Sequence, residues 1–181
     1  MEGRLVLLSG ERGAGKTTVC RKTIELARSH GYTCGGLLTL PRGDGVLDVL
    51  DVQSGDSQQL TVDPADPEAV PQGAFHFDLQ TLSWGNGVLA AAAPCDLLVI
   101  DELGPLEIVQ GRGWWKAFDG LRRSDFALAL AVIRPELLTR AHLKLPLVST
   151  TVLTATTENR QELPEAIVAL LRREVDALSR S

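Results

Sequence analysis

Short apolar runs alternate with amphipathic stretches along this chain. Residues 5–9 (LVLLS), 96–100 (DLLVI) and 126–133 (FALALAVI) are almost continuously apolar, which is typical of strands covered on both faces of a parallel sheet. Residues 16–29 and 163–178 instead carry apolar side chains at the three- and four-residue spacing of a helix that packs along one side. Strands that alternate with helices predict an α/β fold with a mainly parallel sheet.

The remaining segments predict an antiparallel hairpin at one edge of the sheet, a loop and further strands and helices. Residues 41–45 (PRGDG) favour a tight turn between two strands, so a hairpin is expected to add an antiparallel piece near one edge of the sheet. Residues 54–73 are polar and contain three prolines, which predicts an irregular loop. The length of 181 residues predicts a single domain over residues 1–181. The other expected elements are strands at 35–40, 46–52, 74–77 and 147–155, and helices at 79–93, 114–122 and 136–142.

A glycine-rich loop lies between the first expected strand and the first expected helix. Residues 10–17 (GERGAGKT) fit the pattern G-x-x-x-x-G-K-[ST], in which glycines let several backbone N–H groups point at a phosphate. Lys16 is expected to reach the β- and γ-phosphates, and Thr17 to hold Mg²⁺. The expected nucleotide contacts are Gly10, Glu11, Arg12, Gly13, Ala14, Gly15, Lys16, Thr17 and Thr18.

Two adjacent acids follow the apolar run at residues 96–100. A buried strand that ends in Asp101 and Glu102 needs a reason, because burying charge is costly. Magnesium supplies one: Asp101 is expected to bind the ion, through water, and Glu102 to orient or deprotonate an attacking water. An exposed strand terminus is the alternative. The loop and the acids should meet, because ligands of open α/β sheets bind beyond the carboxyl ends of the strands.

Phosphoryl transfer usually needs a further positive charge near the γ-phosphate. Arg134 follows the apolar run at 126–133 and is expected on the same rim, where it would contact phosphate; a helix-entry or salt-bridge role is the alternative. Arg112 and Arg12 are further candidates, and an arginine from another subunit stays open.

A nucleobase needs an apolar or aromatic wall. The candidates are the tryptophans Trp84, Trp114 and Trp115, and the residues after the last strand, Thr156, Thr157, Asn159 and Arg160. Trp114 and Trp115 are adjacent, so both cannot face the core from one helix, and one of them should be partly exposed. Core packing is the alternative for each tryptophan.

Composition narrows the class of protein further. Hydrophobic residues make up 44% and charged residues 23%, which is ordinary globular usage and excludes a disordered chain. The net charge of −5, without blocks of Lys or Arg, argues against nucleic-acid binding, and no apolar run approaches the roughly 20 residues of a membrane span. Three cysteines without CxxC spacing favour a reduced, cytoplasmic setting. A monomer or weak homo-oligomer is expected.

Four segments together resemble a known family. They are residues 10–18 (GERGAGKTT), Gly35-Gly36, 101–107 (DELGPLE) and 153–160 (LTATTENR), and they look like the nucleoside-triphosphatase family first described in thermophiles, also known as cancer-related nucleoside-triphosphatase. The resemblance implies a three-layer P-loop fold with a RecA-like core, and slow Mg²⁺-dependent hydrolysis of nucleoside triphosphates with broad base tolerance.

By matched position, the resemblance implies phosphate and magnesium roles for Lys16 and Thr17, a metal role for Asp101 and a catalytic role for Glu102. Glu107 matches a second acid of the family. Residues 54–86 depart from the basic, aromatic-containing stretch that the family often has there.

The sequence therefore predicts hydrolysis of ATP, GTP and other nucleoside 5′-triphosphates to diphosphate and phosphate, by in-line attack of water. A small-molecule or nucleoside kinase is one alternative, although residues 54–73 contain no Arg or Lys for a phosphate-covering lid. A nucleotide-dependent switch that acts on an unseen partner is the other.

Overall fold

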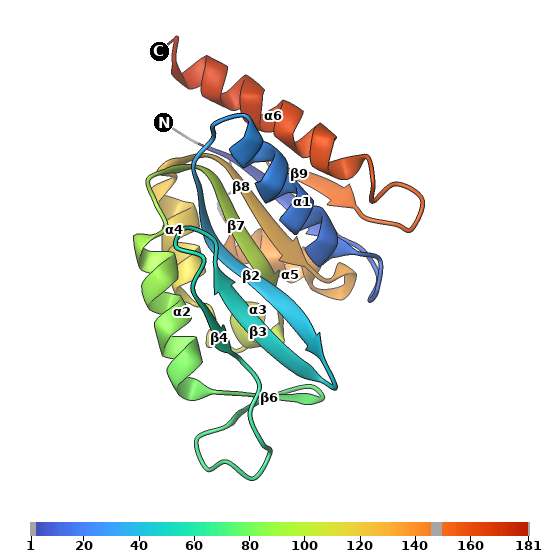
Figure 1. Ribbon diagram of the computed structural model, residues 1–181, viewed down its shortest axis with the longest axis vertical. Helices are drawn as coiled ribbons and strands as arrows, with labels where there is room; N and C mark the ends of the chain where they lie inside the picture. Colours follow the sequence, from blue (N-terminus) through green and yellow to red (C-terminus); the bar gives the residue numbers. More distant parts are fainter. Residues whose placement is uncertain (1–2, 146–149, 181) are drawn as a thin grey trace.

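The computed structural model describes residues 3–145 and 150–180. Figure 1 shows a large twisted sheet with helices on both faces. In chain order the elements are β1 (Arg4–Ser9), α1 (Lys16–Ser29), β2 (Cys34–Gly43), β3 (Val46–Asp51), β4 (Ser57–Gln59), β5 (Val70–Gln72), β6 (Phe75–Phe77), α2 (Leu79–Ala91), β7 (Cys95–Leu103), α3 (Pro105–Ile108), α4 (Lys116–Arg123), β8 (Phe126–Ile133), a 3₁₀ turn (Pro135–Leu137), α5 (Leu138–Lys144), β9 (Thr150–Thr154) and α6 (Leu163–Leu178).

The main sheet has seven strands in the order β4-β3-β2-β7-β8-β1-β9. The five strands from β2 to β9 in this order are parallel, whereas β3 and β4 are antiparallel at one edge. The mainly parallel sheet and its antiparallel hairpin are therefore confirmed. Parallel strands end at the same edge, so the segments that follow β1, β7, β8 and β9 share one rim. A separate two-stranded sheet is formed by β5 and β6.

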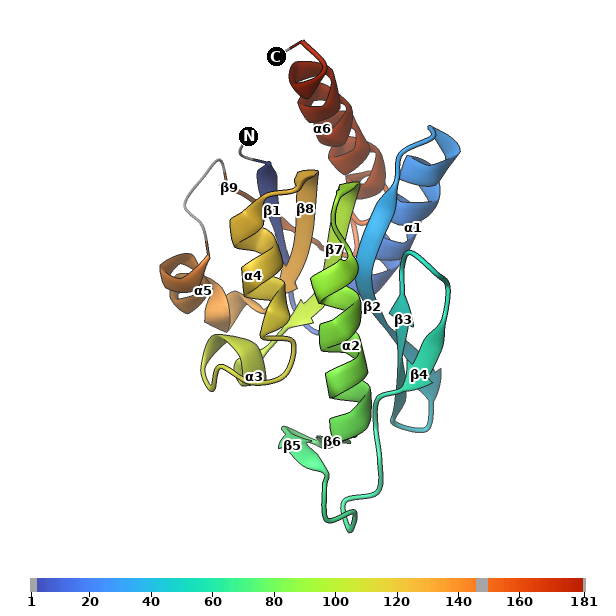
Figure 2. The same cartoon turned by 90° about the vertical axis from the view of Figure 1, so that its left-hand side faces the viewer.

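Helices cover the sheet in two layers, which makes three layers in all. Figure 2 shows α1 and α6 on one face and α2, α4 and α5 on the other. Each interface holds its own apolar core, and β8 lies between them with all eight residues buried. The apolar run of β8 is thus explained by burial on both faces.

The strand that carries the acids is longer than expected. β7 runs from Cys95 to Leu103, so Asp101 and Glu102 lie within it and not after its end. Pairing with β2 continues through Leu38 and Asp101, and the register against β8 shifts between Ile100 and Leu103. The prediction ended the strand at the first charge, but backbone pairing with a neighbouring strand does not depend on side-chain polarity.

Residues 54–73 are not wholly irregular, which corrects the expectation of a loop. β4 pairs with β3, β5 pairs with β6, and Leu60 and Val70 are buried beside them. Each of these strands pairs with a strand close by in the sequence, but their own residues, SQQ in β4 and VPQ in β5, carry no alternating apolar pattern that would predict a strand. The expected strand 147–155 is seen as β9 over 150–154; residues 147–149 lie outside the described residues.

The helices also depart from expectation at their ends. α2 stops at Ala91 and not at residue 93, and the helix expected at 136–142 is a 3₁₀ turn followed by α5. α4 begins at Lys116, because the preceding Trp114 turns into the core. The Trp114 side chain packs against Gly85 of α2, where a Cβ would lie 2.3 Å from the Trp114 ring. The short helix α3 was not predicted.

Two further features bear on the class of protein. The three cysteines Cys20, Cys34 and Cys95 are free thiols. Among the described residues, no helix combines the length and the apolar character needed to cross a membrane.

Candidate active site

The glycine-rich loop closes over its own lysine. β1 ends at Ser9 and α1 begins at Lys16, whose Nζ donates to the backbone oxygens of Gly10 at 2.5 Å and Glu11 at 2.9 Å. Among the described residues, no carboxylate forms an ion pair with Lys16. Gly10 also has to be glycine, since a Cβ there would lie 2.4 Å from the carbonyl oxygen of Ala155. The loop therefore holds a cation over inward-facing backbone at the start of a helix, which suits an anion.

Asp101 lies buried beside this loop. Its Oδ2 has no hydrogen-bond partner among the described residues, and its backbone oxygen accepts from the Thr39 hydroxyl at 2.5 Å. Burial raises the pKa of the Asp101 carboxyl to about 7; the Thr17 hydroxyl and the Lys16 ammonium oppose this rise, and the Glu102 charge adds to it. A buried carboxylate oxygen without a partner is costly. A divalent cation would satisfy this oxygen, and the Thr17 hydroxyl offers a second oxygen donor.

Glu102 and Arg134 form an ion pair on the rim. The Nε of Arg134 donates to Oε1 of Glu102 at 2.9 Å, with side chains 46% and 32% exposed respectively. Arg134 therefore lies on the rim where the sequence placed it, and its guanidinium is shared with the acid of β7. Glu102 stays accessible to solvent, which a group that handles an attacking water requires.

Glu107 has a different environment from the other two acids. It is buried, and its Oε2 and Oε1 accept from the backbone N–H groups of Gly104 and Trp114, each at 2.8 Å. Burial raises the pKa of the Glu107 carboxyl, and these two N–H groups oppose the rise. Gly113 packs against it so closely that a Cβ would lie 1.9 Å from Oε1. Glu107 therefore ties together the loop that follows the strand-end acids.

A pocket of about 460 Å³ opens over the loop. Its lining is Gly10, Glu11, Arg12, Gly13, Ala14, Pro135, Thr154, Ala155, Thr156 and Thr157. The residues after β9 thus approach the glycine-rich loop, as expected for segments that share one rim, and their contact with a base stays a prediction. Arg160 lies against the end of the loop, where a Cβ on Gly15 would lie 2.9 Å from its Cδ. Asn159 hydrogen-bonds the backbone of Thr156 and Thr154, which shapes the segment from within.

The tryptophans and Arg112 lie elsewhere. Trp114 is buried, Trp84 packs against the same core, and Trp115 is 46% exposed, so the expectation that one of the adjacent pair is partly exposed is confirmed. Among the described residues, no tryptophan lines the loop pocket, and Arg112 lines a different one with Trp115.

Two residues near the loop were missed from sequence. Thr39 holds the backbone of Asp101, and Pro135 forms part of the pocket wall. Thr39 carries no sequence signal, because a strand threonine is common and its partner is 62 positions away. Pro135 could have been found from its place directly after Arg134.

A strand, a glycine-rich loop and a helix, with a buried acid on a parallel strand beside them, define a P-loop nucleotide-binding protein. A family model described as NTPase matches residues 5–168. The chain is 33% identical over 173 residues to nucleoside-triphosphatase THEP1 of Methanosarcina acetivorans, an alignment that covers 90% of this chain and 93% of that protein. The chain therefore belongs to the nucleoside-triphosphatase family.

Solved structures agree on the fold. The solution structure of a human cancer-related nucleoside triphosphatase matches with a TM-score of 0.71 and 23% identity, over 94% of this chain and 98% of that one. The crystal structure of THEP1 from Aquifex aeolicus matches with a TM-score of 0.66 and 19% identity, over 92% and 98% of the two chains. The P-loop α/β fold expected from the sequence is confirmed.

Proposed function

We propose that this protein hydrolyses nucleoside 5′-triphosphates, ATP and GTP among them, to diphosphate and phosphate in a Mg²⁺-dependent reaction. The observation that carries the proposal is the buried Asp101 carboxyl, whose Oδ2 lacks a partner among the described residues and which interacts with the Thr17 hydroxyl and the Lys16 ammonium of the glycine-rich loop. A carboxylate kept in such a place at a cost in stability indicates a charged ligand. The family supports a triphosphate as that ligand.

Each residue has a role that follows from its position. The backbone N–H groups of residues 10–15 and the Lys16 ammonium would bind the β- and γ-phosphates. Thr17 and Asp101 would hold the magnesium ion, Asp101 through water. When bound, the ion would supply positive charge that offsets the charge of the phosphates. Positioning and charge stabilisation would therefore supply most of the acceleration.

Glu102 is proposed to orient the attacking water and to take up its proton. Its partly exposed carboxylate forms an ion pair with Arg134, so the proposed base and a positive charge lie next to each other on the rim. Arg134 is proposed to turn to the γ-phosphate when substrate fills the rim. An Arg134→Gln variant should then lose turnover on the order of 10²-fold, as removal of one charge-stabilising donor does.

Broad base tolerance is supported by the wall of the loop pocket. Apart from Glu11 and Arg12 of the loop itself, the lining consists of small polar and apolar residues, and among the described residues no aromatic side chain takes part. Such a wall has few groups with which to discriminate one base edge from another. We therefore propose similar turnover of purine and pyrimidine triphosphates.

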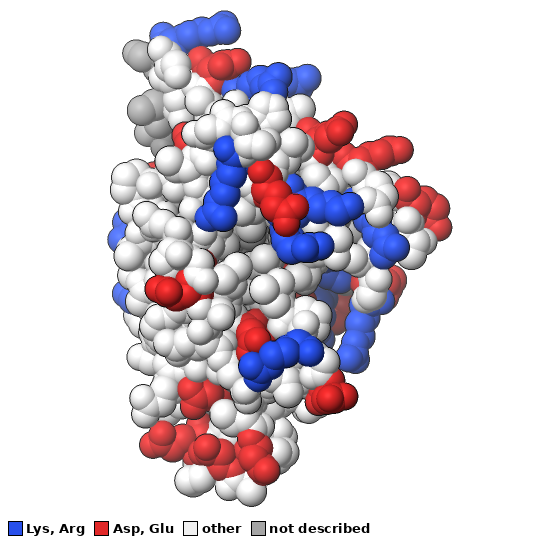
Figure 3. Space-filling view, viewed as in Figure 1, with Lys and Arg blue, Asp and Glu red and all other residues white. Residues whose placement is uncertain are grey.

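The kinase alternative finds less support. A lid over a transferred phosphate needs cations, whereas residues 54–73 contain none and carry Asp63, Asp66 and Glu68 at their centre. Figure 3 shows acidic side chains gathered at the end of the molecule that this segment forms. An acidic surface there would repel a triphosphate.

The test is phosphate release from ATP, GTP, CTP and UTP, with Mg²⁺ and with EDTA. Lys16→Ala should weaken triphosphate binding and turnover, and Lys144→Ala, an exposed lysine on α5, is the matched control. Release that needs Mg²⁺ and Lys16 with all four bases supports the proposal. Release that persists in EDTA, or no release by a wild-type protein that binds triphosphate, contradicts it.

A further inference from the structure

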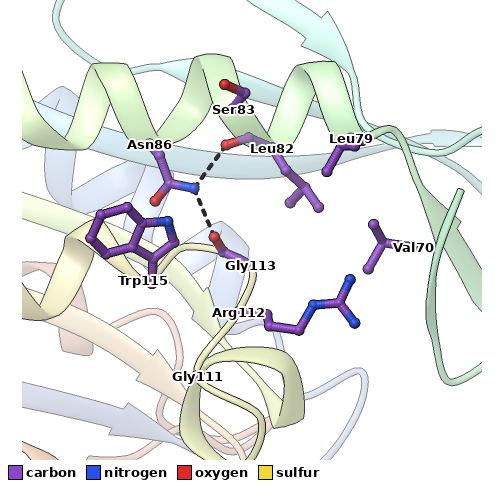
Figure 4. Close-up of a pocket in the computed structure, with 9 residues that line it drawn as sticks. All are labelled: Val70, Leu79, Leu82, Ser83, Asn86, Gly111, Arg112, Gly113 and Trp115. Atoms are coloured by element: carbon purple, nitrogen blue, oxygen red, sulfur yellow. Dashed lines mark hydrogen bonds between the residues drawn. The ribbon is translucent and has the colours of Figure 1, made fainter. Parts of the chain in front are cut away.

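A second pocket, of about 340 Å³, lies between α2 and residues 111–115, with Val70 of β5 at one end. Figure 4 shows Arg112 extending toward Val70, while Trp115 lies beside Asn86. Among the described residues, this pocket shares no lining residue with the phosphate-loop pocket. It is therefore a separate place for a ligand.

The walls of this pocket expose apolar surface. Leu82 and Val70 are buried in its floor, whereas Leu79 and Trp115 are each 46% exposed. The ammonium of Lys116 lies 4.1 Å from the centroid of the Trp115 ring. Two large apolar side chains that stay half-exposed around one hollow are typical of a binding surface for a planar, apolar group.

Arg112 supplies the one charge in the lining. Its guanidinium has no hydrogen bond or ion pair among the described residues, and no described carboxylate lines the pocket. A guanidinium binds carboxylate, phosphate and sulfonate groups through paired N–H donors.

The pocket is preformed. Asn86 donates to the backbone oxygens of Leu82 and Gly113, at 2.9 and 2.8 Å, and its Oδ1 accepts from Lys116 N at 3.0 Å. The backbone N–H of Trp114, next to the pocket, donates to Oε1 of Glu107 at 2.8 Å. Both walls are thus fixed without a ligand, so little ordering cost would oppose binding.

We propose that this pocket binds a small anionic molecule with a planar apolar body, whose anion pairs with Arg112 and whose ring packs near Leu79 and Trp115. Size and charge carry this choice: the hollow suits a small molecule, and its lining offers a cation but no carboxylate. The proposal does not depend on the hydrolytic reaction, because it concerns residues outside the loop pocket.

The experiment titrates the folded chain with 8-anilinonaphthalene-1-sulfonate, an anionic aromatic probe, and follows probe fluorescence. We expect one probe per chain, with affinity about tenfold weaker in Arg112→Gln, the loss expected for a charge-assisted hydrogen bond. Trp115→Ala should also weaken binding. N-phenyl-1-naphthylamine, which lacks the sulfonate, should bind the wild type no better than the charged probe binds Arg112→Gln.

Arg12→Gln and Lys16→Ala are the matched controls, because they remove a cation from the other pocket. Both should keep the wild-type affinity for the probe. Unchanged affinity in Arg112→Gln and Trp115→Ala, or a loss in Arg12→Gln or Lys16→Ala in their place, would overturn the proposal. So would equal binding of the neutral probe. Circular dichroism of each variant checks that it keeps the fold, which we expect for Arg112→Gln and Trp115→Ala because both side chains are exposed.

Discussion

The acids of residues 101–107 occupy two different regions of the molecule. Asp101 and Glu102 lie in β7 at the rim of the sheet, where Asp101 keeps an oxygen without a partner among the described residues and Glu102 is shared with an exposed arginine. Glu107, a few residues on, uses both oxygens to accept buried backbone N–H groups. In sequence these carboxylates look alike.

The comparison teaches that hydrogen-bond partners distinguish the roles of these acids. An acid whose oxygens are held by the backbone supports the fold, whereas an acid with an oxygen left free can bind a ligand. A buried carboxylate whose two oxygens accept backbone N–H groups is committed to holding those groups, and its removal leaves them without an acceptor. A buried acid that lacks such partners lowers the stability of the fold, which indicates that it is present to bind a ligand. We therefore expect the strand-end acids to control turnover and Glu107 to control stability.

The largest effect should come from Glu102→Gln. Turnover should fall by about 10²–10⁴-fold, the range for loss of a general base. The free energy of unfolding should change by less than about 1 kcal/mol, because the lost ion pair with Arg134 is exposed. Phosphate release and urea unfolding measure the two quantities. Turnover that persists in this variant would remove Glu102 from the mechanism.

The next effect should be the loss of stability in Glu107→Ala. Two buried N–H groups lose their acceptor, at roughly 1–3 kcal/mol each, so we expect a loss of about 2–6 kcal/mol in urea unfolding. Glu107→Gln keeps one good acceptor and should lose less. If Glu107→Ala unfolds like the wild type, Glu107 is not a structural tie.

A smaller loss is expected for Gly113→Ala, and Gly111→Ala is its matched control. Both glycines have positive φ, +63° and +67°, so either alanine should cost about 1–2 kcal/mol. Only at Gly113 would the Cβ collide with Glu107. The difference between the two variants in thermal unfolding therefore measures how tightly the carboxylate is held. Equal losses would show that Glu107 can move aside.

The smallest change in stability should follow Arg134→Gln. Its ion pair with Glu102 is exposed, and such pairs contribute about 0–1 kcal/mol. Urea unfolding should therefore barely shift. A loss above about 2 kcal/mol would mean that Arg134 supports the fold, and that its proposed effect on turnover is indirect.

The sequence predicts the glycine-rich loop and the strand-end acids of the candidate site because each of these signals lies in consecutive residues. The loop at 10–17 needs glycines, Lys16 and Thr17 in one order along one turn, and the acids at 101 and 102 directly follow an apolar run. The apolar run of β8 predicted its burial for the same reason: each pattern reports on consecutive residues. The parallel sheet then brings the strand ends to one rim by topology alone.

Other features depend on partners that are distant along the chain. β7 extends to Leu103 because Asp101 pairs with Leu38 of β2 and Leu103 pairs with Ile133 of β8. Trp114 enters the core because Gly85 leaves room for it on α2. A single sequence without these neighbours cannot indicate them.

The sequence by itself determined the α/β class, the phosphate loop and the strand-end acids, because each is written in consecutive residues. Only the tertiary structure decided that Glu107 accepts the backbone N–H groups of Gly104 and Trp114. It also decided that Arg134 pairs with Glu102, and that Arg112 and Trp115 line a second pocket. The physical reason is that satisfaction of a buried polar group depends on which atoms surround it in space.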